Sequence, residues 1–90
     1  MDPNWDDMKI FLAVAREESL SGAGRVLKLD PATVGRRIAR LEESLATPLF
    51  VKSPQGYALS AAGDRLLTHG EQAEQAMRAA TEALTGPSDS

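Results

Sequence analysis

Three arginines, Arg36, Arg37 and Arg40, stand close together near the middle of a 90-residue chain. The guanidinium group of arginine stays protonated and donates paired hydrogen bonds to phosphate oxygens or to the edge of a guanine base. Positions 36 and 40 lie about one helical turn apart, so a helix brings both to one face. The pattern predicts contact with DNA. A solvated helix surface without a partner is the simpler alternative.

Small residues precede these arginines at Ala32 and Gly35. They allow a helix to approach another surface closely, and a helix that begins with small residues and continues with arginine suits the major groove of DNA. The same basic face could instead dock an acidic protein, which is the competing hypothesis. These two functions differ in whether they require double-stranded DNA as the partner.

The charge of the chain is distributed unevenly along it. The formal net charge is −3 and the pI is about 5.0, which argues at first against nucleic acid as a partner. Residues 22–65, however, hold seven basic and four acidic side chains, whereas residues 1–21 and 66–90 are both acidic. The basic segment contains the three arginines, so the charge distribution favours DNA contact in the middle of the chain.

Other kinds of chemistry have little support in the sequence. There is no cysteine and only one histidine, His69, so neither a thiolate metal site nor a serine–histidine nucleophile is expected. The sequence therefore predicts no enzymatic activity, no catalytic residue, no metal and no cofactor. The longest uncharged apolar stretch, residues 10–15, is too short to span a membrane.

Two helices are expected before the arginines. The first begins after a cap at Asn4 and fades near Glu18, with apolar residues at helical spacing between them. Ser21 is expected to cap a short second helix that ends near Lys28. The buried side of this second helix is expected to consist of Leu20, Ala23, Val26 and Leu27.

A third helix carries the arginines. Asp30 followed by Pro31 is a strong start signal, because the carboxylate caps the helix and proline suits its first position. The helix is expected to end near Leu45. Its inward face consists of Val34, Ile38, Leu41 and Leu45. Two helices joined by a tight turn, with arginines on the second, predict a helix-turn-helix.

The rest of the chain predicts a hairpin and a long helix. Residues 49–52 and 57–59 are two short strands around a turn, and Lys52 and Gln55 would reach DNA from this wing. Ser60 is expected to cap a last helix that extends to about residue 84 or 85. The expected fold is mainly α: a winged helix-turn-helix over 1–60, a dimerisation helix over 61–85 and a flexible tail over 86–90.

The last helix has a heptad-like apolar pattern. The spacing alternates between four and three residues, as in a coiled coil. The members of this seam are Leu66, Gly70, Ala73, Met77, Ala80 and Leu84. The seam predicts a homodimer formed through this helix, and the alternative is that the stripe packs on the domain's own core.

Five stretches of the chain resemble LysR-type transcriptional regulators. They are MKIFLAVA at 8–15, SLSGAG at 19–24, LDPATVGRRIARLE at 29–42, PLF at 48–50 and GYALSAAG at 56–63. The resemblance implies a cytoplasmic bacterial regulator that binds a palindromic type of operator in double-stranded DNA. It also implies a linker helix that pairs antiparallel in a homodimer, and a tetramer is possible in the full-length protein. A larger domain that binds a small-molecule effector is expected beyond this chain.

The resemblance also indicates which residues contact DNA. Arg36 is the leading candidate for a base or phosphate contact, with Thr33 and Arg37 beside it. The full candidate set is Ser21, Pro31, Ala32, Thr33, Gly35, Arg36, Arg37, Arg40, Lys52 and Gln55. The chain departs from the family where Asp30-Pro31-Ala32 replaces Ser-Gln-Pro and Gly35 replaces a serine. Gly24 replaces a frequent alanine, which is expected to cost the second helix up to about 1 kcal/mol.

Overall fold

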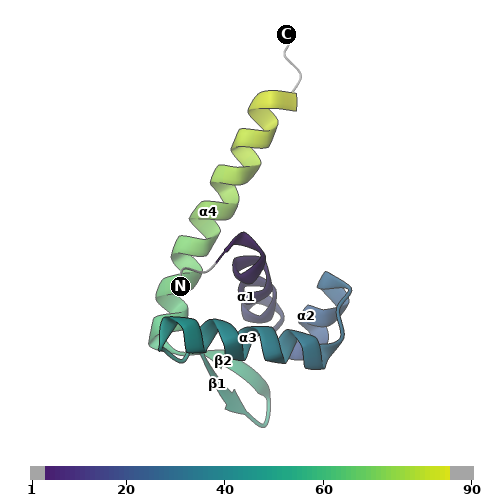
Figure 1. The fold of residues 1–90 in the computed structure, drawn as a ribbon, viewed down its shortest axis with the longest axis vertical. Coiled ribbons are helices and arrows are strands. Elements are labelled where there is room, and N and C mark those ends of the chain that lie inside the picture. The colour runs from purple at the N-terminus through teal and green to yellow at the C-terminus, as the bar shows by residue number, and fades with distance from the viewer. Residues whose placement is uncertain (1–3, 86–90) are drawn as a thin grey trace.

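The computed structural model describes residues 4–85 and consists of three packed helices, a hairpin and one long helix that extends away from them (Figure 1). The elements are α1 (Trp5–Glu17), α2 (Leu20–Leu27), α3 (Pro31–Leu45), β1 (Phe50–Ser53), β2 (Gly56–Leu59) and α4 (Ala61–Thr85). The prediction of a mainly α winged helix-turn-helix with a long last helix is confirmed. The tail predicted for 86–90 lies outside the described residues.

Three of the expected helix starts are confirmed by their side-chain caps. The side-chain oxygens of Asn4, Asp30 and Ser60 each accept a hydrogen bond from the backbone N–H three residues later, at 2.9, 3.3 and 3.0 Å. Pro31 occupies the first turn of α3, where its missing N–H has no partner to lose. These local signals fix where α1, α3 and α4 begin.

The start of α2 was predicted wrongly. Ser19, not Ser21, caps this helix, and its Oγ accepts a hydrogen bond from the N–H of Gly22 at 2.9 Å. The reason is the end of α1, where Glu18 takes the left-handed conformation and places the next residue in an extended one. Ser21 therefore lies inside the first turn of α2 and is exposed.

The buried side of α2 agrees with the prediction except at Val26, since Ala23 is buried and Leu20 and Leu27 pack half-buried against the core. Val26 is 61 % exposed, and the buried residues are Gly22, Ala23 and Gly24. A Cβ atom added at Gly24 would lie 2.5 Å from the carbonyl oxygen of Leu29. The glycine thus allows the turn before α3 to pass directly over α2, a packing requirement that helix propensity alone did not reveal.

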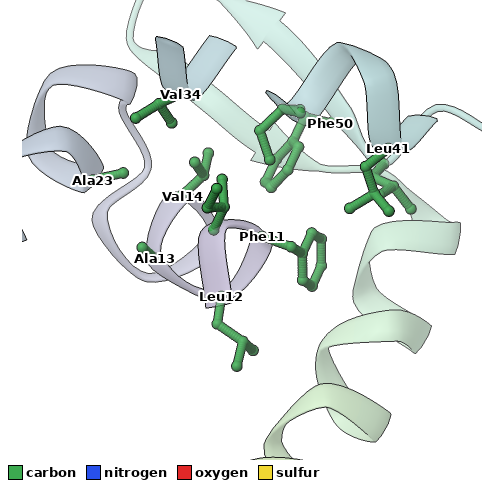
Figure 2. Close-up of a cluster of buried hydrophobic side chains, with 11 residues drawn as sticks. Phe11, Leu12, Ala13, Val14, Ala23, Val34, Leu41 and Phe50 are labelled. Carbon is green, nitrogen blue, oxygen red and sulfur yellow. The ribbon is translucent and has the colours of Figure 1, made fainter. Parts of the chain in front are cut away.

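One hydrophobic core joins the helices to the hairpin. Figure 2 shows labelled side chains from α1, α2, α3 and β1 converging on the same cluster. Phe11 is fully buried, and its ring centroid lies 5.4 Å from that of Phe50, which in turn meets Tyr57 edge-on at 5.8 Å. The expected inward residues Val34, Ile38 and Leu41 are buried, and Leu45 is half-buried against the cluster. This core fixes the orientation of α3.

Candidate nucleic-acid interface

The outward face of α3 carries the residues expected to approach DNA. Because Val34 and Ile38 face the core, Ala32, Arg36 and Arg40 lie on the opposite side, and all three are exposed. Nη2 of Arg36 donates a hydrogen bond to Oγ1 of Thr33 at 3.1 Å, which holds the guanidinium along the helix. The resulting surface is basic, has small residues at its N-terminal end and contains no buried charge.

Arg37 has a different environment from its neighbours. Its Nη2 donates to Oδ1 of Asp7 on α1 at 3.4 Å, and the Arg37 side chain is only 29 % exposed. Among the described residues its Nε is buried without a hydrogen-bond partner. The structure therefore places Arg37, a residue predicted to contact DNA, against α1, where its side chain forms a contact between two helices.

Other predicted site residues lie at the edges of this surface. Pro31 is exposed at the start of α3, and Ser21 is exposed on α2. Gly35 is half-buried, because α2 covers it: a Cβ atom there would lie 3.1 Å from Cδ1 of Leu20. This close packing explains why a small residue suits position 35.

The hairpin is held in place by contacts that the sequence did not reveal. A carboxylate oxygen of Glu42, near the end of α3, accepts hydrogen bonds from the N–H groups of Leu49 and Phe50 at 2.7 and 3.1 Å. The N–H of Tyr57 donates to the carbonyl oxygen of Glu18 at 3.0 Å. Because both α3 and α1 anchor the hairpin, its position relative to α3 is fixed.

The wing exposes both of its predicted contact residues. Lys52 lies in β1 and Gln55 in the turn, and both side chains are exposed. The strands pair antiparallel, with Phe50 opposite Leu59, and Phe50 turns into the core. Glu42 anchors the wing, and Arg37 contacts α1. Because these two residues are five positions apart on α3, the wing and α1 attach to different flanks of the helix.

The apolar seam on α4 is divided between two environments. Gly70 is buried against α1, where an added Cβ atom would lie 2.8 Å from the sulfur of Met8, and Leu66 packs on the domain's own core. For these two positions the alternative of intramolecular packing is correct. The remaining seam residues are exposed, namely Ala73, Met77, Ala80 and Leu84. Leu84 is 88 % exposed and Met77 is 49 % exposed.

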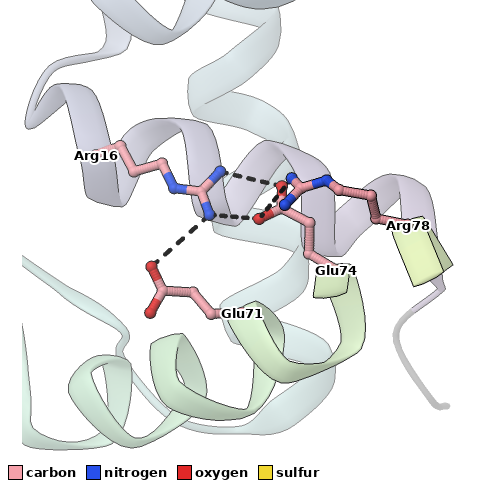
Figure 3. A network of polar contacts seen from close by, with 4 residues as sticks. All are labelled: Arg16, Glu71, Glu74 and Arg78. Atoms are coloured by element: carbon pink, nitrogen blue, oxygen red, sulfur yellow. Dashed lines mark hydrogen bonds and ion pairs between the residues drawn. The ribbon is translucent and has the colours of Figure 1, made fainter. Parts of the chain in front are cut away.

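An ion-pair network connects α1 with α4 (Figure 3). Two nitrogens of Arg16 donate to the two carboxylate oxygens of Glu74 at 3.1 and 2.6 Å. Glu71 lies 3.7 Å from Arg16, and Arg78 lies 3.9 Å from Glu74. The hydrogen bond to Arg16 lowers the pKa of Glu74, and the same bond raises the pKa of Arg16. Sequence analysis missed this network because its central partners, Arg16 and Glu74, lie 58 residues apart.

Within residues 4–85, no group of three or more His, Cys, Asp or Glu side chains is arranged to hold a metal ion. In that same part of the chain, no helix combines the length and the apolar character needed to cross a membrane.

Comparison with known proteins identifies the family. The family model described as "Bacterial regulatory helix-turn-helix protein, lysR family" matches residues 5–64. The HTH-type transcriptional regulator YofA of Bacillus subtilis is 42% identical over 66 residues, which are 73% of this chain and 23% of YofA. The HTH-type transcriptional activator IlvY of Salmonella typhimurium is 36% identical over 66 residues, 73% of this chain and 22% of IlvY. The chain thus spans about a quarter of the length of these curated relatives.

Solved structures agree with this result. The structure of a complex of the CbnR DBD with DNA has a TM-score of 0.80 and 26% identity to this chain, covering 92% of this chain and 97% of that one. A complex of the BenM DBD with benA site 1 DNA shares the fold, with a TM-score of 0.86 and 18% identity over 92% of this chain and 96% of that chain. The chain therefore belongs to the lysR family of bacterial regulatory helix-turn-helix proteins, a family of transcription regulators, and has the fold of a LysR DNA-binding domain with its linker helix.

Proposed function

We propose that this chain binds double-stranded DNA in a sequence-dependent manner as a homodimer, with α3 in the major groove and the wing on the adjacent backbone or minor groove. The observation that carries the proposal is the exposed face of α3, where small residues precede Arg36 and Arg40. Family membership supports it, because related domains have been crystallised with DNA. In this proposal, residues 1–60 form the DNA-binding unit and residues 61–85 form the linker.

Arg36 is the central contact in this proposal. Its hydrogen bond to Thr33 keeps the guanidinium extended along α3, so less side-chain freedom is lost when it meets a base or a phosphate. The exposed Ala32 lets the helix backbone approach the groove, and Gly35, which faces Leu20 of α2, would border it. Arg40 is one turn further along and is suited to a phosphate at the edge of the groove.

Contacts at the periphery complete the proposed interface. Lys52 and Gln55 of the wing would meet the backbone or the minor groove, and lysine there acts as a point charge without the paired donors of arginine. Pro31 and Ser21 would border the groove from the start of α3 and from α2. Arg37 has less support than the others, because it is engaged with Asp7.

The exposed half of α4 supports the dimer. A lone helix that leaves Met77 49 % and Leu84 88 % exposed would gain stability by covering them with a second copy. Small residues at Ala73 and Ala80 allow two such helices to pack closely. Antiparallel pairing of α4 would then place two copies of α3 against two half-sites of a palindromic type of operator.

The whole protein would regulate transcription in the bacterial cytoplasm. Because the chain spans about a quarter of the length of its relatives, a domain that binds a small-molecule effector is proposed outside it. The proposal extends to a tetramer for the full-length regulator. No cofactor is proposed for the DNA-binding part itself.

Selection of bound duplexes from a random pool, followed by mobility shifts at several salt concentrations, tests the function. We expect one enriched pair of half-sites and an affinity that falls by about 10³- to 10⁵-fold between low and moderate salt, since several phosphates are neutralised per dimer. Binding to acidic proteins without sequence-dependent retention of DNA would support the competing hypothesis, a protein-docking module that uses the same basic face.

A further inference from the structure

The outermost contact between α4 and the rest of the molecule is made by charged side chains. Arg16 lies in the last turn of α1 and binds both carboxylate oxygens of Glu74, while Glu71 approaches the same guanidinium (Figure 3). Arg16 and Glu74 are 43 % and 26 % exposed, so the pair lies at the surface but is partly shielded. A paired contact of this kind fixes direction as well as distance.

This contact lies just before the exposed end of α4, so it can affect the direction of that end. Gly70 is the last buried residue of α4, Glu74 follows one turn later, and every described residue after Glu74 is exposed. The final part of the helix, residues 75–85, is thus exposed throughout, and the ion pair is the last partly shielded contact with the body before it. This final part extends about 16 Å at ~1.5 Å per residue.

The surface proposed to meet a second copy lies on this same part of the helix. Met77 and Leu84 are there, so a tilt of α4 near Glu74 moves the proposed dimer surface relative to α3. In a twofold dimer the tilt acts twice, once in each protomer. The separation of the two α3 helices depends on the tilt of α4 relative to α3, and the spacing of the half-sites depends on that separation.

We propose that Arg16 is a positioning residue that sets the direction of α4 through Glu74 and Glu71, and thereby sets the half-site spacing that the dimer accepts. This inference rests on the proposed function. Arg16 lies on α1, away from the DNA-facing side of α3, and acts on DNA only through the geometry of α4. An exposed ion pair shifts a conformational equilibrium by up to about fivefold, so its loss should broaden the range of α4 directions without releasing the helix.

A distance measurement tests the geometry without DNA. The chain has no cysteine, so two can be introduced at the exposed Glu43 of α3 and Glu82 of α4 and labelled with spin probes. In samples diluted with unlabelled protein, pulsed electron resonance then reports the distance within one protomer. We expect a narrow distribution in the parent protein and a broader one in Arg16→Gln. Identical distributions in the two proteins would overturn the inference.

Further variants separate positioning from a general loss of packing. Glu74→Gln should broaden the distribution as Arg16→Gln does, and the double variant should broaden it no further, because both remove the same contact. Arg16→Lys should recover part of the narrow distribution. Arg78→Gln is the matched control, since Arg78 contacts Glu74 only from within α4 at 3.9 Å. Additive broadening in the double variant, or equal broadening in the control, would contradict the proposal.

A duplex library with two half-sites and a variable spacer tests the consequence for DNA. The parent protein should prefer one spacing by about fivefold or more over its neighbours, and Arg16→Gln should discriminate less while keeping its affinity for a single half-site. An unchanged spacing preference would overturn the inference. If neither protein retained DNA, the proposed function would fail, whereas the distance measurement would still decide whether Arg16 positions α4.

Discussion

Arg36 and Arg37 are neighbours in the chain but have different surroundings. One residue corresponds to a rotation of about 100° around a helix, which moves the second side chain from the solvent to the flank of α1. Arg36 is exposed and bonded to Thr33, whereas Arg37 is paired with Asp7 and has a buried Nε. Sequence reasoning assigned both to DNA because type and spacing do not reveal which flank another helix covers.

This difference predicts unequal effects of the same substitution. Arg36→Gln should weaken binding to the selected operator by about 1–3 kcal/mol, because a placed contact with a base or phosphate is lost. Arg37→Gln removes the same charge and serves as the matched control. It should weaken DNA binding much less and instead lower the free energy of unfolding, because Asp7 loses its partner. Equal losses of operator affinity in titrations of the two variants would contradict this assignment.

Two glycines should respond oppositely to alanine. Gly24→Ala places a Cβ atom 2.5 Å from a backbone carbonyl oxygen, that of Leu29, and is expected to destabilise the domain by about 1–3 kcal/mol. Gly35→Ala meets only the side-chain end of Leu20 at 3.1 Å, which can move. This variant should be neutral or gain up to about 1 kcal/mol from helix propensity. Urea denaturation of both variants measures these differences, and stabilisation by Gly24→Ala would refute the packing argument.

At the level of elements, local signals were sufficient where one residue determines a helix end. Asn4, Asp30 and Ser60 cap their helices as predicted, because a cap depends only on the next three residues. The cap of α2 was misplaced by two residues, since two serines with the same capping ability stand close together and the end of α1 decides between them. Propensity contains no information about that choice.

Contacts between elements were beyond sequence reasoning for a physical reason. The bonds from Glu42 to the start of β1 and from Arg16 to Glu74 depend on how the helices cross. Crossing angles follow from the fit of side chains in the core, which no periodic pattern specifies. The candidate DNA-facing residues on α3 were predictable from spacing, whereas the contacts that hold the wing and the linker in place were not.

The ion pair between α1 and α4 predicts a dependence of stability on pH. Because the hydrogen bond to Arg16 lowers the pKa of Glu74 below its ordinary value of 4.5, the pair stabilises the fold above that pH and loses its effect as the pH falls through the lowered pKa. At neutral pH, Glu74→Gln should reduce the free energy of unfolding by up to about 1 kcal/mol, a small value because solvent screens the pair. Below that pKa the two proteins should unfold alike.

Urea titrations of the parent protein and Glu74→Gln at a series of pH values measure this difference. Arg78→Gln is again the appropriate control, because Arg78 touches Glu74 only at 3.9 Å and is 62 % exposed. A stability difference between parent and Glu74→Gln that stayed constant down to strongly acidic pH would show that the carboxylate charge is not the cause.

For the whole molecule, the acidic net charge and the proposed DNA contact are compatible because the charges are segregated. The basic residues concentrate in 22–65, which includes α3 and the wing, while α4 from residue 71 onward carries Glu71, Glu74 and Glu82 against a single Arg78. A weakly acidic protein attracts DNA little at long range. The affinity for DNA must then come from a few arginine and lysine contacts, repeated in each protomer. Dimer formation therefore contributes more to this affinity than it would in a strongly basic domain.

The dimer itself is therefore the decisive prediction at this scale. Met77→Glu combined with Leu84→Glu puts charges on the exposed apolar side of α4 and should convert the protein to a monomer, because burying these carboxylates between two helices is costly. Sedimentation should show the smaller species. The helix content should be unchanged, since neither residue is part of the core. The monomer should bind a single half-site weakly and should no longer prefer DNA with two half-sites over DNA with one.

Ala79→Glu provides the matched control, because residue 79 is exposed and lies about 160° around α4 from residue 77, on the opposite side of the helix. A charge there should leave the dimer intact. If the double variant stayed dimeric, or if Ala79→Glu dissociated the dimer equally, the partner would have to sit on another face of α4. The surface that Arg16 positions would then not be the one formed by Met77 and Leu84, so this experiment also decides which face of α4 the ion pair would move relative to α3.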